Sequence, residues 1–215
     1  MSLIDLQKQG RIVVKGAYVL LFIVVVFYLV TRALPMLIVT RENYTDYYWP
    51  RAGWLFLHVL TGILTTSLGV IQFFPNLRKK SIRIHKLNGY VYALCVALAA
   101  TGAGYLALTT KLNSIYSAGL LLGAIVWMIT TAIALYAVKI RNVNQHQEWM
   151  TRSYVVSLFF IIYMFIKDIC RELNLINVIG TEAEASALLV WVSWTVPLFL
   201  TEVVLQLKKL IRSKK

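Results

Sequence analysis

The feature that most constrains this fold is a series of apolar stretches that contain few or no charged residues. Each is about 20 residues long, which is enough for a helix to cross the hydrocarbon core of a bilayer. The chain is 59% hydrophobic and 14% charged, with a mean hydropathy of +0.70, so it has too little polar surface for a soluble domain of this size. We therefore predict an all-α, polytopic protein, one integral membrane domain over residues 1–215. The six expected spans are 13–34, 52–74, 87–109, 115–138, 150–169 and 186–206.

The distribution of Lys and Arg predicts the orientation of these spans. Most of the 22 basic residues fall at one set of span ends, in the segments 8–15, 78–86, 139–152 and 208–215. Basic residues concentrate on the cytoplasmic side of a membrane, so both termini are expected in the cytoplasm and the protein in the cell inner membrane. The net charge of +13 follows from these flanking residues and predicts no nucleic-acid partner. The expected partners are the bilayer itself and anionic lipid head groups at the cytoplasmic loops.

A stripe of small and polar residues runs along the second span. His58, Gly62, Thr65, Gly69 and Gln72 recur at intervals of three and four, which places them on one helical face. Such residues suit contacts between helices and not contacts with lipid. Similar stripes occur in the next three spans, whereas the first span is bulky all round. We expect a central four-helix bundle of spans 2–5, with spans 1 and 6 at its periphery.

The three histidines all lie on the expected bundle. His85 and His146 begin spans 3 and 5, which enter the membrane from the same side. They could present two imidazoles to one another, an arrangement that a haem iron or another metal could use. Alternatively, both could bind lipid phosphate or cap a helix. His58 lies deeper in its span, near the opposite face, and is either functional or bonded to a neighbouring helix.

The sequence from HVLTG through LGVIQFFPNLRKKSIRIHKLNGYVY to HQEWMTRSY resembles an uncharacterised bacterial membrane-protein family, domain of unknown function 2306. The resemblance covers about residues 58–165, and the family name implies no activity. Its specific residues are His58, Gly62, Gly69, Gln72, His85, Gly89, Tyr92, His146, Trp149, Met150 and Arg152.

A fainter similarity is to the cytochrome b561-type electron carriers, whose four middle helices hold two b-type haems between histidine pairs. It implies that His85 and His146 are the axial ligands of a cytoplasmic-side haem b. His58 would be an outer-side ligand without a partner, because Tyr116 stands near the position that needs the second outer histidine. A quinone or another redox partner would then exchange electrons with the protein.

Polar residues around the cytoplasmic-side pair could support such a haem. Basic side chains suit the haem propionates, and an amide could orient an axial imidazole. The candidates are Arg83, Lys86 and Arg152 for the propionates and Gln72 for the imidazole.

Two other functions remain open from the sequence. The first is a non-enzymatic scaffold or assembly partner without a cofactor. The second is an intramembrane metal hydrolase, which is disfavoured because His58 lies about 16 residues, or roughly 24 Å, from the cytoplasmic end of its span. One zinc ion cannot be shared by histidines so far apart. Glu202, an acid well inside the sixth span, either has a functional role or extends to the interface.

Overall fold

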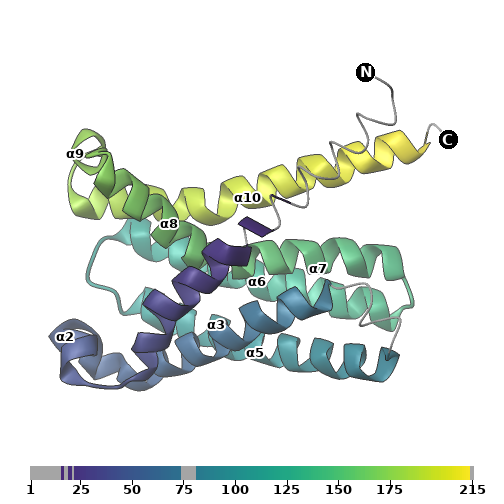
Figure 1. Ribbon diagram of the computed structural model, residues 1–215, viewed down its shortest axis with the longest axis horizontal. Helices are drawn as coiled ribbons and strands as arrows, with labels where there is room; N and C mark the ends of the chain where they lie inside the picture. The colour runs from purple at the N-terminus through teal and green to yellow at the C-terminus, as the bar shows by residue number, and fades with distance from the viewer. Residues whose placement is uncertain (1–15, 17–18, 21, 74–80, 214–215) are drawn as a thin grey trace.

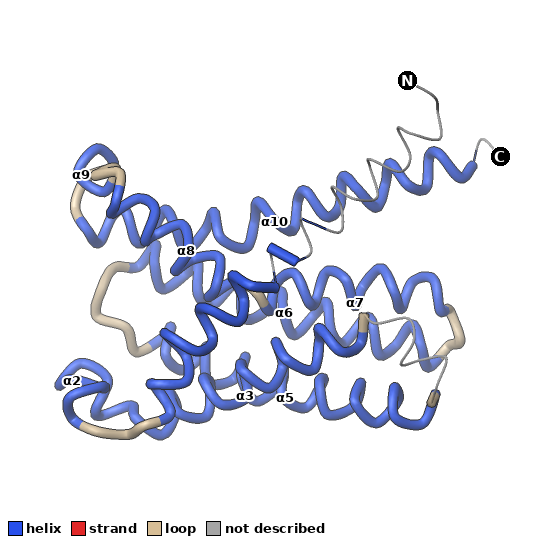
Figure 2. The backbone as a smooth tube through the Cα atoms, in the orientation of Figure 1, coloured by secondary structure: helices blue, strands red, loops and turns tan. Residues whose placement is uncertain are grey.

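The computed structural model describes residue 16, residues 19–20, 22–73 and 81–213, and these form helices joined by short loops, with no strand among them (Figures 1 and 2). The all-α prediction is therefore confirmed. The principal helices are α2 (Arg41–Tyr48), α3 (Ala52–Gln72), α5 (Ile82–Leu108), α6 (Ser114–Lys139), α7 (Val143–Ser157), α8 (Phe159–Glu172), α9 (Ile176–Ile179) and α10 (Glu182–Ser213). Short π and 3-10 turns, Leu29–Ala33, Leu34–Leu37 and Trp49–Arg51, precede α2 and α3.

Four of the described helical segments are long and apolar enough to cross a membrane, namely Arg41–Gln72, Ile82–Leu108, Ser114–Lys139 and Glu182–Ile211. The pair α7 and α8 makes a fifth candidate if it is one broken span. The predicted spans 52–74, 87–109 and 115–138 differ from α3, α5 and α6 by only a few residues. Part of the predicted first span lies outside the described residues, and its described helix, Phe22–Leu37, is shorter than a full span.

The predicted fifth span is not straight. Its two halves, α7 and α8, meet at Leu158 with a bend of 43°. The hydroxyl of Ser157 donates to the carbonyl of Tyr154 at 2.6 Å, and bonds of this kind compete with the helix ladder and bend helices. The sixth predicted span, in contrast, is one helix that continues through Pro197.

Side-chain caps fix where the bundle helices begin. Ser81, Asn113 and Asn142 each accept a hydrogen bond from a backbone N–H three residues on, at the starts of α5, α6 and α7. These bonds satisfy donors that the first helical turn leaves without partners. Arg141 takes a positive φ of 61° in the turn before α7, which lets the chain reverse between α6 and α7.

The helices α3, α5, α6 and α7 pack as a four-helix bundle in which each contacts the next along the chain, and α3 also contacts α7. The long helix α10 lies on α6, α7 and α8 (Figure 1). The bundle core consists of Tyr92, Val96, Ala99, Ala100, Ala124, Trp127 and Val156. We call the end where α3 and α6 finish and α5 and α7 begin the histidine end, because His85 and His146 lie there.

Some members of the small-residue stripe are close-packing positions and others are not. A Cβ added at Gly69 would lie 2.3 Å from the Tyr154 ring and 3.3 Å from the Tyr92 ring. Because glycine has no side chain, both aromatic rings can pack against α3 at this position. A Cβ at Gly62, on the same face, would meet nothing within 4 Å. The stripe therefore marks the buried side of α3, but only part of it is required for helix contact.

At the end opposite the histidine end, a buried cation ties α3 to α5. The guanidinium of Arg51 donates to the carbonyl of Thr109 at 2.9 Å and to that of Tyr47 at 2.6 Å. Its carbon centre lies 4.3 Å from the centre of the Tyr47 ring. Thr109 follows the last residue of α5, where the helix dipole is negative and favours a cation.

Candidate functional site

Tyr92 and Ser153 connect α5 and α7 across the bundle. The Tyr92 hydroxyl and the Ser153 Oγ are 2.8 Å apart, and both residues are fully buried. His85 precedes Tyr92 by seven residues, and His146 precedes Ser153 by seven. Seven residues are nearly two helical turns, so His85 lies on the same face of α5 as Tyr92, and His146 on the same face of α7 as Ser153. Each histidine is about 10 Å nearer the histidine end than the residue with which it shares a face. The helices α5 and α7 run in the same direction (Figure 1). Each histidine precedes one partner of the Tyr92–Ser153 contact by the same number of residues, so the two lie at similar levels of the bundle.

The ring of His146 is anchored by one nitrogen. Its Nδ1 lies 2.9 Å from the carbonyl oxygen of Ala134 on α6. A carbonyl can only accept, so Nδ1 carries the donated proton and a neutral ring has its free lone pair on Nε2. Metal-binding histidines commonly have this arrangement, with the second nitrogen fixed by a carbonyl.

His85 lies against the end of α3. The Gln72 side chain donates to the backbone carbonyl of His85 at 2.9 Å, and Asn88 donates to the carbonyl of Leu68 at 3.2 Å. These two amides hold the first turns of α5 to α3. Gln72 therefore contacts the backbone of His85, whereas the sequence predicted a contact with an axial imidazole.

Of the three predicted basic residues, Arg83 and Lys86 are exposed near the start of α5, whereas Arg152 is buried. Arg152 donates to one oxygen of Glu202 on α10 through Nε at 3.0 Å and Nη2 at 2.5 Å. Its guanidinium also lies 4.6 Å from the Trp149 ring centre. Arg152 thus joins α7 to α10.

The pair Arg152–Glu202 belongs to a larger ion-pair cluster that also includes Glu148 and Lys209. Lys209 Nζ lies 2.7 Å from Glu148 Oε2, and Arg152 Nη1 lies 3.9 Å from the same oxygen. Two acids therefore face two bases, and the cluster has no formal net charge.

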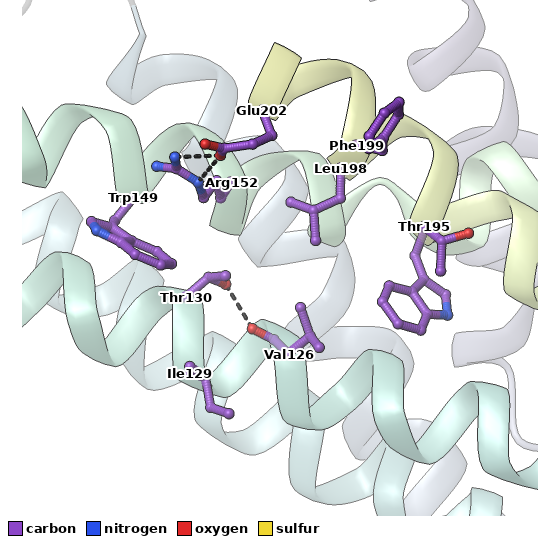
Figure 3. Close-up of a pocket in the computed structure, with 10 residues that line it drawn as sticks. Val126, Ile129, Thr130, Trp149, Arg152, Thr195, Leu198, Phe199 and Glu202 are labelled. Carbon is purple, nitrogen blue, oxygen red and sulfur yellow. Dashed lines mark hydrogen bonds and ion pairs between the residues drawn. The ribbon is translucent and has the colours of Figure 1, made fainter. Parts of the chain in front are cut away.

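A groove of about 470 Å³ begins at this cluster and runs along α10, between α6 and α7 (Figure 3). The helix α6 contributes Val126, Ile129 and Thr130, and α7 contributes Trp149 and Arg152. The residues from α10 are Trp194, Thr195, Leu198, Phe199 and Glu202. We call this the α10 groove. Its lining includes neither His85 nor His146, and no sequence pattern indicated it because its walls come from three separated segments.

His58 is held within the bundle. Its Nδ1 lies 2.8 Å from the carbonyl of Ala99 on α5, and a Cβ on Gly102 would approach the His58 Cβ to 3.0 Å. Tyr116 packs instead on the cluster that contains Tyr163 and Val190, between α6, α8 and α10. Within the described part of the chain, no three His, Cys, Asp or Glu side chains come together as a metal site.

The hydrogen bonds at the centre of the bundle were not predicted from the sequence. The Ser153 Oγ contacts the Tyr92 hydroxyl and also the Thr131 Oγ1, at 2.7 Å, so that three helices share one buried polar group. Ser153 was visible on the small-residue face of its span, but nothing in the sequence indicated which helix its hydroxyl would meet.

The long apolar helices and the polar residues of their interior define a multi-pass helical membrane protein. The sequence matches the family described as Predicted membrane protein (DUF2306) over residues 55–205, more than half of the chain, and the chain belongs to that family. The resemblance expected from the motifs is thereby confirmed. No curated protein matches the chain, and no solved structure does either.

Proposed function

We propose that this protein binds one b-type haem through His85 and His146 and acts in electron transfer. The observation that carries the proposal is the Tyr92–Ser153 contact, which joins α5 and α7 across the bundle about two helical turns from His85 and His146. The bond between His146 Nδ1 and the Ala134 carbonyl supports it further, because it leaves Nε2 as the metal-binding nitrogen. Haem b would supply a one-electron iron couple there, and His85 and His146 would be the residues that hold it.

The surrounding residues fit this group only in part. Arg83 and Lys86 are exposed beside His85 and are available for the propionates. Arg152 is committed to Glu202 and Glu148, so we assign it no propionate role. His58 has a structural bond to α5, and the proposal therefore involves a single haem.

The topology that accompanies the proposal has six spans, with both termini and the histidine end in the cytoplasm. The described helices include four candidate spans and a bent fifth candidate, and the first apolar stretch would supply the sixth. The basic residues that flank the histidine end support this orientation. Reporter fusions at residue 1 and residue 215 would test it, since both should be cytoplasmic.

The deciding experiment is a dithionite-reduced minus air-oxidised absorption spectrum of protein purified from haem-replete cells. We expect a b-type α-band that is lost in His85→Ala and in His146→Ala. The matched control is His58→Ala, which should keep the band. A flat wild-type spectrum would overturn the proposal.

A scaffold without a cofactor is the second candidate, and a specific observation favours it. His58 and His146 each bond a backbone carbonyl of a neighbouring helix, which is sufficient reason for a histidine in a bundle. In that case the double variant His85→Ala, His146→Ala would function normally, and the partner would be another membrane protein.

A further inference from the structure

The side-chain amide of Gln72 lies between α3 and α5 at the histidine end. Its Nε2 lies 2.9 Å from the backbone carbonyl oxygen of His85. A carbonyl oxygen can only accept a hydrogen bond, so the amide nitrogen must face it, and the two ends of the amide are thereby distinguished. The other end, Oε1, is buried and accepts no hydrogen bond from any residue that the structure describes. Gln72 therefore has one atom in use at His85 and one acceptor left over.

A buried acceptor without a donor costs free energy, and most buried polar atoms in proteins do have a partner. The other candidate ligand shows what such an acceptor can do. The Nδ1 of His146 donates to the Ala134 carbonyl at 2.9 Å, which leaves Nε2 as the metal-binding nitrogen. The same requirement applies to His85, and the unused Oε1 belongs to an amide that already contacts this residue.

Gly89 leaves space for this amide. It lies one turn after His85 on α5, and a Cβ at this position would lie 3.4 Å from Gln72 Nε2. A side chain longer than that of alanine would have to share the space with the amide. The glycine therefore allows Gln72 to reach the first turn of α5.

A second amide at the same helix pair provides a comparison. Asn88 donates to the carbonyl of Leu68 at 3.2 Å, so it also holds α5 to α3. Its contact is with the backbone of α3, not with His85. The oxygen of Asn88 is not one of the buried polar atoms that lack a partner in the described ranges. Asn88 thus has the helix-holding role of Gln72 without the unused buried acceptor.

We propose that Gln72 is a positioning residue for His85. Its Nε2 holds the backbone carbonyl of His85, and its Oε1 accepts a hydrogen bond from Nδ1 of the same residue's ring. The lone pair of the neutral ring is then on Nε2, as it is in His146. The effect on electron transfer rests on the proposed function, whereas the orientation of the ring does not.

The orientation is tested without haem, by NMR of full-length protein that carries ¹⁵N-labelled histidine, at a pH where the rings are neutral. The His85→Ala spectrum assigns the His85 signals. We expect the Nδ1–H tautomer of His85 in the wild type and in Gln72→Glu, which keeps an acceptor oxygen. Gln72→Leu should lose this preference, whereas the matched control Asn88→Leu should keep it. The same tautomer in Gln72→Leu as in the wild type would overturn the proposal.

The reduction potential of the haem-loaded protein gives a second readout. A stronger acceptor at Nδ1 makes the imidazole a better electron donor and stabilises the oxidised iron. Gln72→Glu should therefore lower the potential and Gln72→Leu should raise it, whereas Asn88→Leu should leave it unchanged. Shifts of the same sign in both Gln72 variants would show that Gln72 only holds the helices together, and would reject the positioning role. A flat wild-type spectrum would reject the haem, and the NMR result would still decide the role of Gln72.

Discussion

Arg152 on α7 directs two guanidinium nitrogens to a single carboxylate oxygen of Glu202 on α10. This contact joins the bundle to the long helix outside it, at a place where Arg152 is buried and Glu202 is partly exposed. Glu148 and Lys209 complete the cluster, so no formal charge is left over. The charges are thus arranged for mutual compensation and for helix docking.

Breaking this pair from one side should destabilise the protein. Glu202→Ala leaves the buried Arg152 with only the more distant Glu148, and we expect a loss of about 1–3 kcal/mol in the free energy of unfolding, less than for a fully buried pair because Glu202 is partly exposed. Thermal unfolding in detergent measures it. The double variant Arg152→Met, Glu202→Met should recover much of the loss, and additive losses would contradict the pairing.

Removing the Ser153 hydroxyl should be more damaging than removing that of Tyr92. Ser153→Ala leaves the buried Tyr92 hydroxyl without its close partner, which costs about 1–3 kcal/mol. Tyr92→Phe removes the hydroxyl itself and keeps the Ser153–Thr131 bond, so a loss of about 0.5–1.5 kcal/mol is expected. The unfolding free energies of the two variants give the comparison. The opposite ranking would show that the hydroxyls do not act as one group.

Two glycines on one face of α3 should respond differently to alanine. Gly69→Ala places a Cβ against the rings of Tyr154 and Tyr92, and we expect a destabilisation of about 1–3 kcal/mol. Gly62→Ala meets no atom within 4 Å and should be neutral or slightly stabilising, since alanine favours helix. Melting temperatures in one detergent provide the measurement. A matching loss in Gly62→Ala would mean that the whole stripe is close-packed.

The carbonyl contacts of Arg51 should be specific to a guanidinium. A lysine at this position cannot donate to the carbonyls of Thr109 and Tyr47 through two separate nitrogens, as the guanidinium does. We therefore expect Arg51→Lys to destabilise the protein almost as much as Arg51→Met. Limited proteolysis between α2 and α3 reports the loosening directly. Full protection of the lysine variant would indicate that charge alone holds this contact.

The sequence predicted the bundle helices well because their signal is local. The lengths of the apolar stretches predicted α3, α5 and α6, and the small-residue stripes indicated which sides of these helices are buried. Periodicity records that a side chain is buried, but it does not identify its neighbour. The Tyr92–Ser153 contact and the α10 groove depend on how separate helices pack, and for that reason they became apparent only in the structure.

The predicted site also shows that positions along the chain can be predicted from the sequence, whereas contacts between separate helices cannot. The placement of His85 and His146 in the first turns of α5 and α7 followed from the order of the spans alone. The partners of Arg152 and Gln72 did not, because each long side chain could reach several groups near the histidine end. The break at Leu158 was not predicted, because apolar residues continue on both sides of it. The pattern therefore does not indicate that the Ser157 hydroxyl bonds a backbone carbonyl and so competes with the helical hydrogen bonds.

The bend at Leu158 has a consequence for how the molecule can come apart. Its first half, α7, belongs to the four-helix bundle, whereas α8 lies against α10 and against the helix that contains Tyr28, whose hydroxyl donates to Asp168. One uninterrupted segment of chain is therefore shared by two layers. The outer layer, which includes α8 and α10, therefore cannot move along the bundle as one rigid unit. Any such movement must first change the angle between α7 and α8 at Leu158.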